Sequence, residues 1–215
     1  FVDRSAAINA LRALLSQVSF IDEAAFDDSA LWGWIRYAEA DVGRLLGIPL
    51  VPTEVFTDPP TDAELAELGN DPFVLEPGYD YEPGFMSPSQ GYGTLNLRIR
   101  PVIAVHSIKL VYPSFSATVY TIPATWIRLD HKFGAVKIIP GAGMQSAPLS
   151  IFMAQALSAG YPVPHMIRVR YRAGLENVLI EYPDVVQAIY RGAILGLMQN
   201  ILMPTSSSIS ADGLS

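Results

Sequence analysis

The spacing of apolar residues changes twice along this chain, from a helical period to an alternating one and back again. In residues 8–18, apolar side chains recur at intervals of three and four, which indicates one face of a helix. In residues 95–99 they alternate with polar ones, which is typical of a half-buried strand. The helical period returns after residue 183. The sequence therefore predicts an α+β fold with helices at both ends and strands between them.

Two amphipathic helices are expected in the first 47 residues. Asp3 or Ser5 can cap the first, because both side chains accept hydrogen bonds from free amides at a helix start. The second begins at the acidic cluster 27–29, which suits the positive end of the helix dipole, and ends at Gly47. We expect these helices to pack as an antiparallel pair.

The composition changes in residues 52–93, which hold seven prolines among acidic and aromatic residues. Prolines at this density disfavour continuous secondary structure. The exception is residues 61–68, where Thr61 followed by Glu64 begins like a helix cap. We interpret the segment as an ordered excursion that can lie over a neighbouring copy, because its aromatic side chains need a surface to pack on.

Residues 94–173 form the predicted antiparallel β module, with a hairpin turn at 130–134. Strands are expected in six ranges: 95–99, 105–112, 118–122, 126–129, 135–139 and 166–172. A short helix is expected at 147–159, between the last two strands.

A last helix is predicted from Pro183 to the residues before Pro204. Its apolar residues spread over more than one face, so we expect it to be buried. Gly192 and Gly196, four residues apart, allow another element to approach its backbone closely. The serine-rich residues 205–215 form a tail.

The expected architecture joins the N-terminal helical pair and the C-terminal helix, with the antiparallel β module inserted between them. The predicted segments are a helical part at 1–51, an acidic Pro/Tyr-rich excursion at 52–93, the β module at 94–173, the C-terminal helix at 174–204 and the tail at 205–215.

Charge is distributed unevenly. Residues 1–90 hold 16 acids and 4 bases, whereas residues 91–215 hold 5 acids and 10 bases. The overall net charge of -7 argues against free, non-specific DNA binding, so any DNA contact is local. The apolar stretch 188–203 is interrupted by polar residues and is short for a membrane span, so no membrane contact is expected.

No catalytic, cofactor or metal site is expected. The chain has no cysteine, and none of its three histidines has another histidine at metal-ligand spacing. Asp130 and His131 are the one adjacent pair that imitates a base with its orienting acid, but adjacent side chains in a hairpin usually diverge. The carboxylate pairs at 22–23 and 27–28 are explained as helix caps, and the glycines at 141–143 as a turn rather than a dinucleotide loop. The chain is therefore not expected to be an enzyme.

Arginines recur at a period of two in the last predicted strand. Arg168, Arg170 and Arg172 place three guanidinium groups on one strand face, and Arg98 and Arg100 repeat the pattern. One interpretation is a solvated sheet face. The other is a basic contact surface that meets phosphate or an acidic partner, such as residues 52–93 of a neighbouring copy.

The layout of the chain resembles the head-to-tail connector (adaptor) proteins of tailed double-stranded DNA bacteriophages. The resemblance is carried, in order, by residues 37–47, 100–110, 120–123, 126–130, 134–140 and 210–215. It covers most of the chain as a similarity of pattern. The acidic excursion at 52–93 departs from the compact members of that family.

The resemblance implies a structural neck protein of the virion, in which about a dozen copies (a dodecamer) close a ring. Its implied partners are further copies of itself, the portal protein, a tail or tail-terminator (stopper) protein, and genomic DNA that passes non-specifically through the channel. The implied portal-docking tail comprises Ser206, Ser207, Ser208, Ile209, Asp212 and Leu214.

Two other functions stay open at this point. A β module rich in aromatic residues can be a carbohydrate-binding or host-recognition domain, with Trp126, Tyr79, Tyr81 or Tyr92 stacking on sugar rings. A hydrolase that uses Asp130 and His131 is the weakest alternative.

Overall fold

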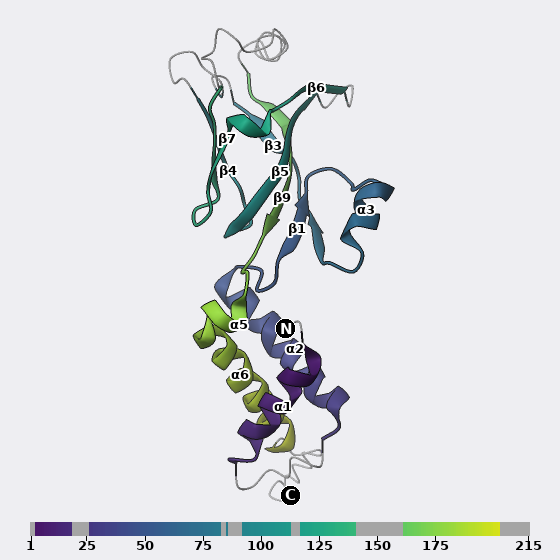
Figure 1. Ribbon diagram of the computed structural model, residues 1–215, viewed down its shortest axis with the longest axis vertical. Helices are drawn as coiled ribbons and strands as arrows, with labels where there is room; N and C mark the ends of the chain where they lie inside the picture. Colours follow the sequence, from purple (N-terminus) through teal and green to yellow (C-terminus); the bar gives the residue numbers. More distant parts are fainter. Residues whose placement is uncertain are drawn as a thin grey trace, which may run out of the picture. The chain divides into compact units, whose positions relative to one another are not determined.

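The computed structural model describes residues 3–18, 26–82, 85, 92–112, 117–140 and 161–202. The chain divides into two compact units, one of residues 1–47 with 177–215 and one of residues 48–176. Helices make up the first unit and the strands lie in the second (Figure 1). The predicted α+β fold, with a β module inserted between helices that pack together, is confirmed.

The helical unit begins with α1 (Arg4–Leu15) and α2 (Asp28–Leu46), and their caps are those predicted. The Asp3 side chain accepts hydrogen bonds from the amides of the first turn of α1, and Asp27 does the same for α2. Gly47 ends α2 with a φ of 67°, a left-handed conformation that glycine adopts without strain. The guanidinium of Arg12 on α1 forms an ion pair with the carboxylate of Asp28 on α2, at a distance of 2.9 Å.

The chain returns to this unit through α5 (Val178–Glu181) and α6 (Pro183–Leu202), and α6 packs along α2. The close approach predicted at the two glycines is confirmed: a Cβ on Gly192 would lie 3.3 Å from the Cβ of Ala38. The prediction of burial all round is wrong for this chain by itself, because Leu195 is 58% exposed. Among the residues of α6 up to position 200, the buried side chains are Ile189, Ala193 and Leu197. No helix within the described ranges is long and apolar enough to cross a membrane.

The β unit contains two sheets. The strands of sheet A are, in spatial order, β2 (Phe73–Leu75), β1 (Thr53–Phe56), β9 (Val163–Ala173), β5 (Val102–Tyr112) and β6 (Ala117–Thr121), with β3 (Tyr79–Tyr81) also pairing with β9. Sheet B consists of β4 (Gly93–Asn96), β8 (Ala135–Ile138) and β7 (Ile127–Asp130). A short 3₁₀ helix, η2 (Ala124–Trp126), precedes β7.

The predicted antiparallel module at 94–173 is confirmed, because every described strand pair within it is antiparallel. The larger β unit also contains one parallel pair, from residues before that module. β1 and β2 run parallel, joined by the crossover helix α3 (Asp62–Leu68), whereas every other described pairing is antiparallel. The predicted cap of α3 is confirmed, since Thr61 and Glu64 form a reciprocal capping box. Residues 52–93 thus supply three strands and a helix to the chain's own sheet. Composition missed these strands because each has only three or four residues and is held by pairing with distant β9 or with β1.

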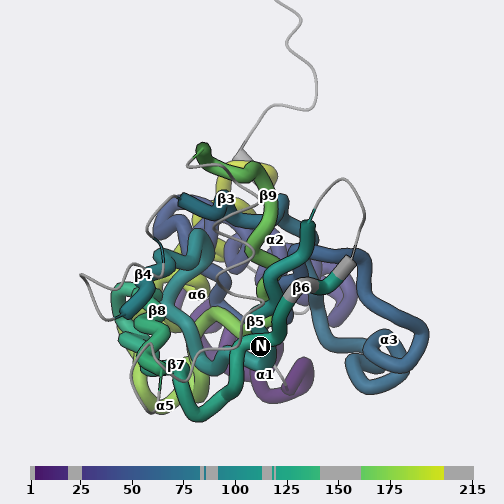
Figure 2. Tube along the Cα trace, turned by 90° about the horizontal axis from the view of Figure 1, so that it is seen from above, coloured from purple at the N-terminus to yellow at the C-terminus, as the bar shows by residue number. Residues whose placement is uncertain are grey.

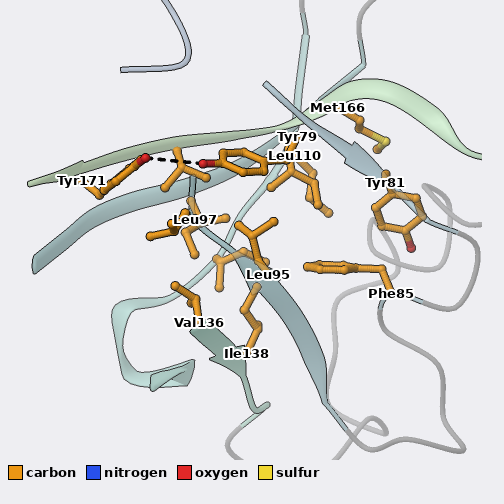
Figure 3. Packing of buried hydrophobic residues seen from close by; sticks show 14 of the residues in the cluster. Tyr79, Tyr81, Phe85, Leu95, Leu97, Leu110, Val136, Ile138, Met166 and Tyr171 are labelled. Carbon is orange, nitrogen blue, oxygen red and sulfur yellow. Dashed lines mark hydrogen bonds between the residues drawn. The ribbon is translucent and has the colours of Figure 1, made fainter. Parts of the chain in front are cut away.

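The core of the unit lies between the two sheets (Figure 3). Along β9, Ile167, Val169 and Tyr171 alternate toward this core, where they meet sheet B side chains such as Val136 and Ile138. The arginines between them point to the other face of sheet A. Figures 1 and 2 show α3 and sheet B on opposite sides of β5 and β9.

The remaining strand predictions agree with the structure to within a few residues. The predicted strand at 95–99 is β4, which begins and ends earlier, and the predicted strand at 166–172 is the longer β9. The predicted turn at 130–134 joins β7 to β8. The helix expected at 147–159 and the glycine turn at 141–143 lie outside the described residues.

Candidate functional site

Each arginine of β9 contacts acids of the same chain. Arg168 lies 3.4 Å from Asp58, and Arg172 lies 3.6 Å from Asp71. Arg170 contacts three carboxylates: Glu54 at 3.6 Å, Glu64 at 3.4 Å and Glu67 at 3.2 Å. All of these acids come from residues 54–71, so the acidic segment, which one interpretation of the sequence gave as a possible partner from a neighbouring copy, faces the arginines of its own chain.

Glu54 is the most buried of these acids, with a side chain only 6% exposed. Its other oxygen lies 3.1 Å from Nε2 of His106 on β5. The Arg170 guanidinium also lies over the ring of Phe56, 5.2 Å from its centre. Because a buried carboxylate is costly without a nearby cation, Arg170 has a structural role in this site.

The helix α3 brings two further acids to Arg170. The Thr61 amide donates a 2.8 Å hydrogen bond to Glu64, and this bond lowers the pKa of the Glu64 carboxyl, with a smaller contribution from the charge of Arg170. The capping box therefore orients a carboxylate that also pairs with β9.

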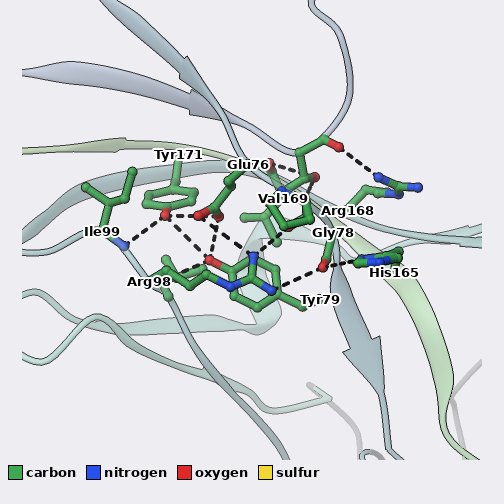
Figure 4. Close-up of polar contacts among 12 residues, drawn as sticks. Glu76, Gly78, Tyr79, Arg98, Ile99, His165, Arg168, Val169 and Tyr171 are labelled. Atoms are coloured by element: carbon green, nitrogen blue, oxygen red, sulfur yellow. Dashed lines mark hydrogen bonds and ion pairs between the residues drawn. The ribbon is translucent and has the colours of Figure 1, made fainter.

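Arg98 belongs to a different cluster, shown in Figure 4. Its guanidinium lies 4.0 Å from the centre of the Tyr79 ring and 3.8 Å from the Glu76 carboxylate, and it donates to the carbonyl of Gly78. His165 on β9 contacts the same carbonyl through Nδ1 at 3.0 Å. This arginine ties the segment before β5 to the turn before β3.

Two buried tyrosines converge on Glu76 in that cluster (Figure 4). Tyr79 donates to the carboxylate at 2.5 Å and Tyr171 at 3.1 Å. The same hydroxyls accept backbone N–H groups, Tyr79 from Arg98 and Tyr171 from Ile99. Burial raises the pKa of the Tyr171 hydroxyl to about 12 and also raises the pKa of Tyr79. Through these two hydrogen bonds, the backbone of residues 98 and 99 is bound to tyrosine side chains of the core.

Sheet B carries a second group of cations that sequence analysis did not single out. Arg128, Lys132 and Lys137 lie on the β7–β8 hairpin, all three are exposed, and none forms an ion pair among the described residues. Arg100 is also exposed, and its Nε donates to the carbonyl of Leu97.

The sequence contains the signal for this second group. Asp130 is the only acid between Glu82 and Glu176. Its Oδ1 accepts the Phe133 amide in the turn at 3.2 Å. Counting acids identifies residues 83–175 as a basic segment with nine bases and one acid, but only the structure separates the hairpin cations from the paired arginines of β9.

Arg128 and Lys137 lie directly opposite each other on β7 and β8, on the exposed face of sheet B. Thr94 on β4 lies opposite Lys137 on the other side of β8, so Arg128, Lys137 and Thr94 form a row across sheet B. Like charges in directly opposed positions destabilise a strand pair, so this row has an electrostatic cost within the chain.

The catalytic pair of the hydrolase alternative is not assembled among the described residues. His131 Nδ1 lies 2.9 Å from the Val102 carbonyl, and Asp130 is held by the turn amide, so the two side chains are engaged separately. No group of three His, Asp or Glu side chains able to hold a metal ion occurs in the part of the chain that the structure describes.

The aromatic residues of the carbohydrate alternative are mostly inaccessible. Tyr79 is 6% and Tyr81 is 1% exposed, so neither ring can stack on a sugar. Tyr92 is exposed, and Trp126 packs partly buried against the core. The six residues of the implied portal-docking tail lie outside the described ranges.

The edge strand β2 presents apolar side chains to solvent. Phe73, Val74 and Leu75 are all more than 40% exposed. Glu54 donates its amide to the Pro72 carbonyl and Glu76 donates to the Phe56 carbonyl, so the amides of Phe73 and Leu75 point away from β1. The strand therefore offers both apolar side chains and backbone amides that have no partner within the described ranges.

Comparison of the sequence with models of known protein families and with curated proteins finds no match.

Proposed function

We propose that this chain is a structural neck protein of a tailed double-stranded DNA bacteriophage. Its copies form a ring that joins the portal to the tail and leaves a channel through which the genome passes. The sequence pattern that resembles head-to-tail connectors motivates the proposal. The observation that carries it is the apolar, unpaired edge of β2.

A ring requires two different surfaces on each subunit, because identical copies meet head to tail. Sheet A has β2 at one end and β6 at the other. Pairing the β2 edge of one copy with the β6 edge of the next would satisfy the outward amides and cover Phe73 and Leu75. β2 itself contains no charge and no proline, although it is only three residues long and lies between Pro72 and Glu76.

The first test is the copy number of this chain in gradient-purified particles, measured by quantitative mass spectrometry against the major capsid protein. A low, fixed number that matches one ring supports the proposal. Absence of the chain from the particles overturns it.

The second test is Leu75→Pro, with ring formation followed by electron microscopy and native mass spectrometry. The outward amide of Leu75 makes no bond to β1, so proline removes only a donor available to another copy. Leu75→Thr is the matched control, because it keeps the amide. We expect the proline variant to fold and to lose assembly while the threonine variant assembles. Equal assembly by both would exclude the β2 edge as the ring contact.

A further inference from the structure

Six cations of the β unit form two groups of three that differ in their partners. Those of β9 face carboxylates of residues 54–71 at 3.2 to 3.6 Å. Those of the β7–β8 hairpin, Arg128, Lys132 and Lys137, have no acidic partner in the described ranges. Among the described residues of the unit, Arg100 and Lys109 also form no ion pair, but the three hairpin cations are the largest group without an acidic partner, whereas the arginine stripe of β9 is paired.

No neighbouring segment of the sequence can neutralise the hairpin. Residues 83–129 and 131–175 contain neither Asp nor Glu, and Asp130 is engaged by the Phe133 amide. Arg128 is also held in place, since its Nη1 donates to the carbonyls of Thr125 and Ile127 at 2.9 Å. The charge is thus exposed, uncompensated and partly ordered.

The opposed pair Arg128 and Lys137 adds an independent observation. Like charges across a strand pair are unfavourable, and a fold that accepts this cost without compensation commonly does so at a binding surface. A bound anion would remove the repulsion. The row therefore points to a ligand that carries several negative charges.

We infer that the exposed face of sheet B contacts the phosphate backbone of double-stranded DNA through Arg128, Lys132 and Lys137. This inference rests on the proposed function, in which the genome passes each subunit, and it names the surface that meets it. Phosphates recur about every 1.7 Å along a duplex axis, so such contact needs no base sequence.

A second copy of this chain fits the hairpin less well than DNA does. Most of its described acids are already engaged within the chain. Asp3 and Asp27 cap helices, and three further acids of the helical unit pair with arginines: Asp28, Glu39 and Asp41. In the β unit, acids between Glu54 and Glu76 pair with arginines of β9 or with Arg98. Five described acids remain without such a partner: Asp62, Glu82, Glu176, Glu181 and Asp184. A duplex presents a denser array of negative charge, with a phosphate about every 1.7 Å along its axis, and therefore matches three clustered cations better.

The experiment measures binding of the full-length chain to a short DNA duplex by fluorescence anisotropy as salt is varied. The test variant is Arg128→Gln/Lys137→Gln. The salt slope should fall by about 2, and binding at about 50 mM salt should weaken by about tenfold for each cation removed. The matched control is Lys109→Gln/Arg172→Gln, which removes the same charge. Lys109 lies directly opposite Arg168 on sheet A, so the control also changes an opposed pair of cations, but one in which Asp58 compensates the charge of Arg168.

We expect the control to bind like the wild-type chain. Equal weakening of test and control variants, or no salt-dependent binding by the wild-type chain, would overturn the inference. Polyglutamate that competes as well as DNA would reassign the surface to an acidic protein and would also overturn it.

These outcomes are separable from those of the proposed function. If the chain is present in particles as one ring but the hairpin variant binds DNA like wild type, only this inference fails. Absence from particles removes the proposed function whatever the DNA result.

Discussion

Gly196 on α6 lies against the indole ring of Trp34 on α2, so closely that a Cβ at Gly196 would be 2.7 Å from the ring atom Cζ3. The close approach explains why a helix-disfavouring residue occupies the middle of α6. This contact determines how closely α2 and α6 approach each other. The two residues also line an open groove of about 580 Å³, together with Tyr37 and Asn200.

Gly196→Ala should therefore destabilise the chain although alanine is the better helix former. Overpacking typically costs about 1–3 kcal/mol, which exceeds the gain of about 1 kcal/mol in helix propensity. Gly33→Ala on α2 is the matched control, because no atom lies within 4 Å of its added Cβ, and it should stabilise the chain. Urea unfolding should show a lower free energy of unfolding for Gly196→Ala and a higher one for Gly33→Ala, each relative to the wild-type chain. A gain in both would show that α2 and α6 separate easily.

Removal of the Arg170 side chain should lower the free energy of unfolding much more than removal of the Arg172 side chain. Arg170→Met leaves the buried Glu54 without its cation and should cost about 3 kcal/mol of unfolding free energy. Arg172→Met breaks a more exposed contact with Asp71 and should cost less than about 1 kcal/mol. Thermal unfolding of the two variants checks this. Similar small decreases would mean that the arginine stripe is not structural.

The stability of the chain should fall in alkaline solution because of the Tyr171 hydroxyl. Its pKa is raised to about 12 in the folded chain, so the protonated form is favoured there. This contribution is complete below the unfolded pKa, near 10, and is lost as the pH rises through about 12. It amounts to about 3 kcal/mol over that interval.

Urea unfolding over an alkaline pH series would measure the effect. Tyr171→Phe should be less stable at neutral pH, because the Ile99 amide loses its acceptor, and should show a shallower alkaline decline. The exposed Tyr92 provides the control, since Tyr92→Phe should follow the wild-type curve. If the stability of Tyr171→Phe declined with rising pH as steeply as that of the wild-type chain, the decline could not be assigned to the Tyr171 hydroxyl.

Reversing one charge of the hairpin should stabilise the fold. Lys137→Glu places opposite charges across β7 and β8, next to Arg128, and should raise the unfolding free energy by about 0.5 kcal/mol. The double variant Arg128→Glu/Lys137→Glu restores like charges and should lose that gain. Denaturant unfolding of both variants gives the coupling. If the double variant is as stable as the single one, the two side chains do not interact.

Much of the local structure could be predicted because its causes lie within a few residues. Asp3, Asp27 and Thr61 cap helices through bonds to amides two or three positions away, and Gly47 ends α2 by its own backbone freedom. The alternation that predicted β9 likewise reflects only the period of a strand.

The candidate site could be predicted only in part. The arginine stripe was found from its period, but whether it was free or paired depended on acids some hundred positions earlier. Glu54 reaches Arg170 because β1 pairs with β9, and composition had indicated no strand there. The sheet B hairpin lies in a long segment nearly without acids, but that segment also contains the arginines of β9, and the opposition of Arg128 and Lys137 needed the register.

The amino-acid sequence by itself therefore determined the caps and ends of the main helices, the six strands within residues 93–173 and the regional balance of charge, since each depends on neighbours along the chain. Tertiary structure alone decided the parallel crossover of β1 and β2, the burial of Tyr79 and Tyr171 around Glu76, and which cations stay without a partner among the described residues. The physical reason is that pairing between distant strands fixes which charges come within a few ångströms of each other, and local periodicity carries no information about that distance.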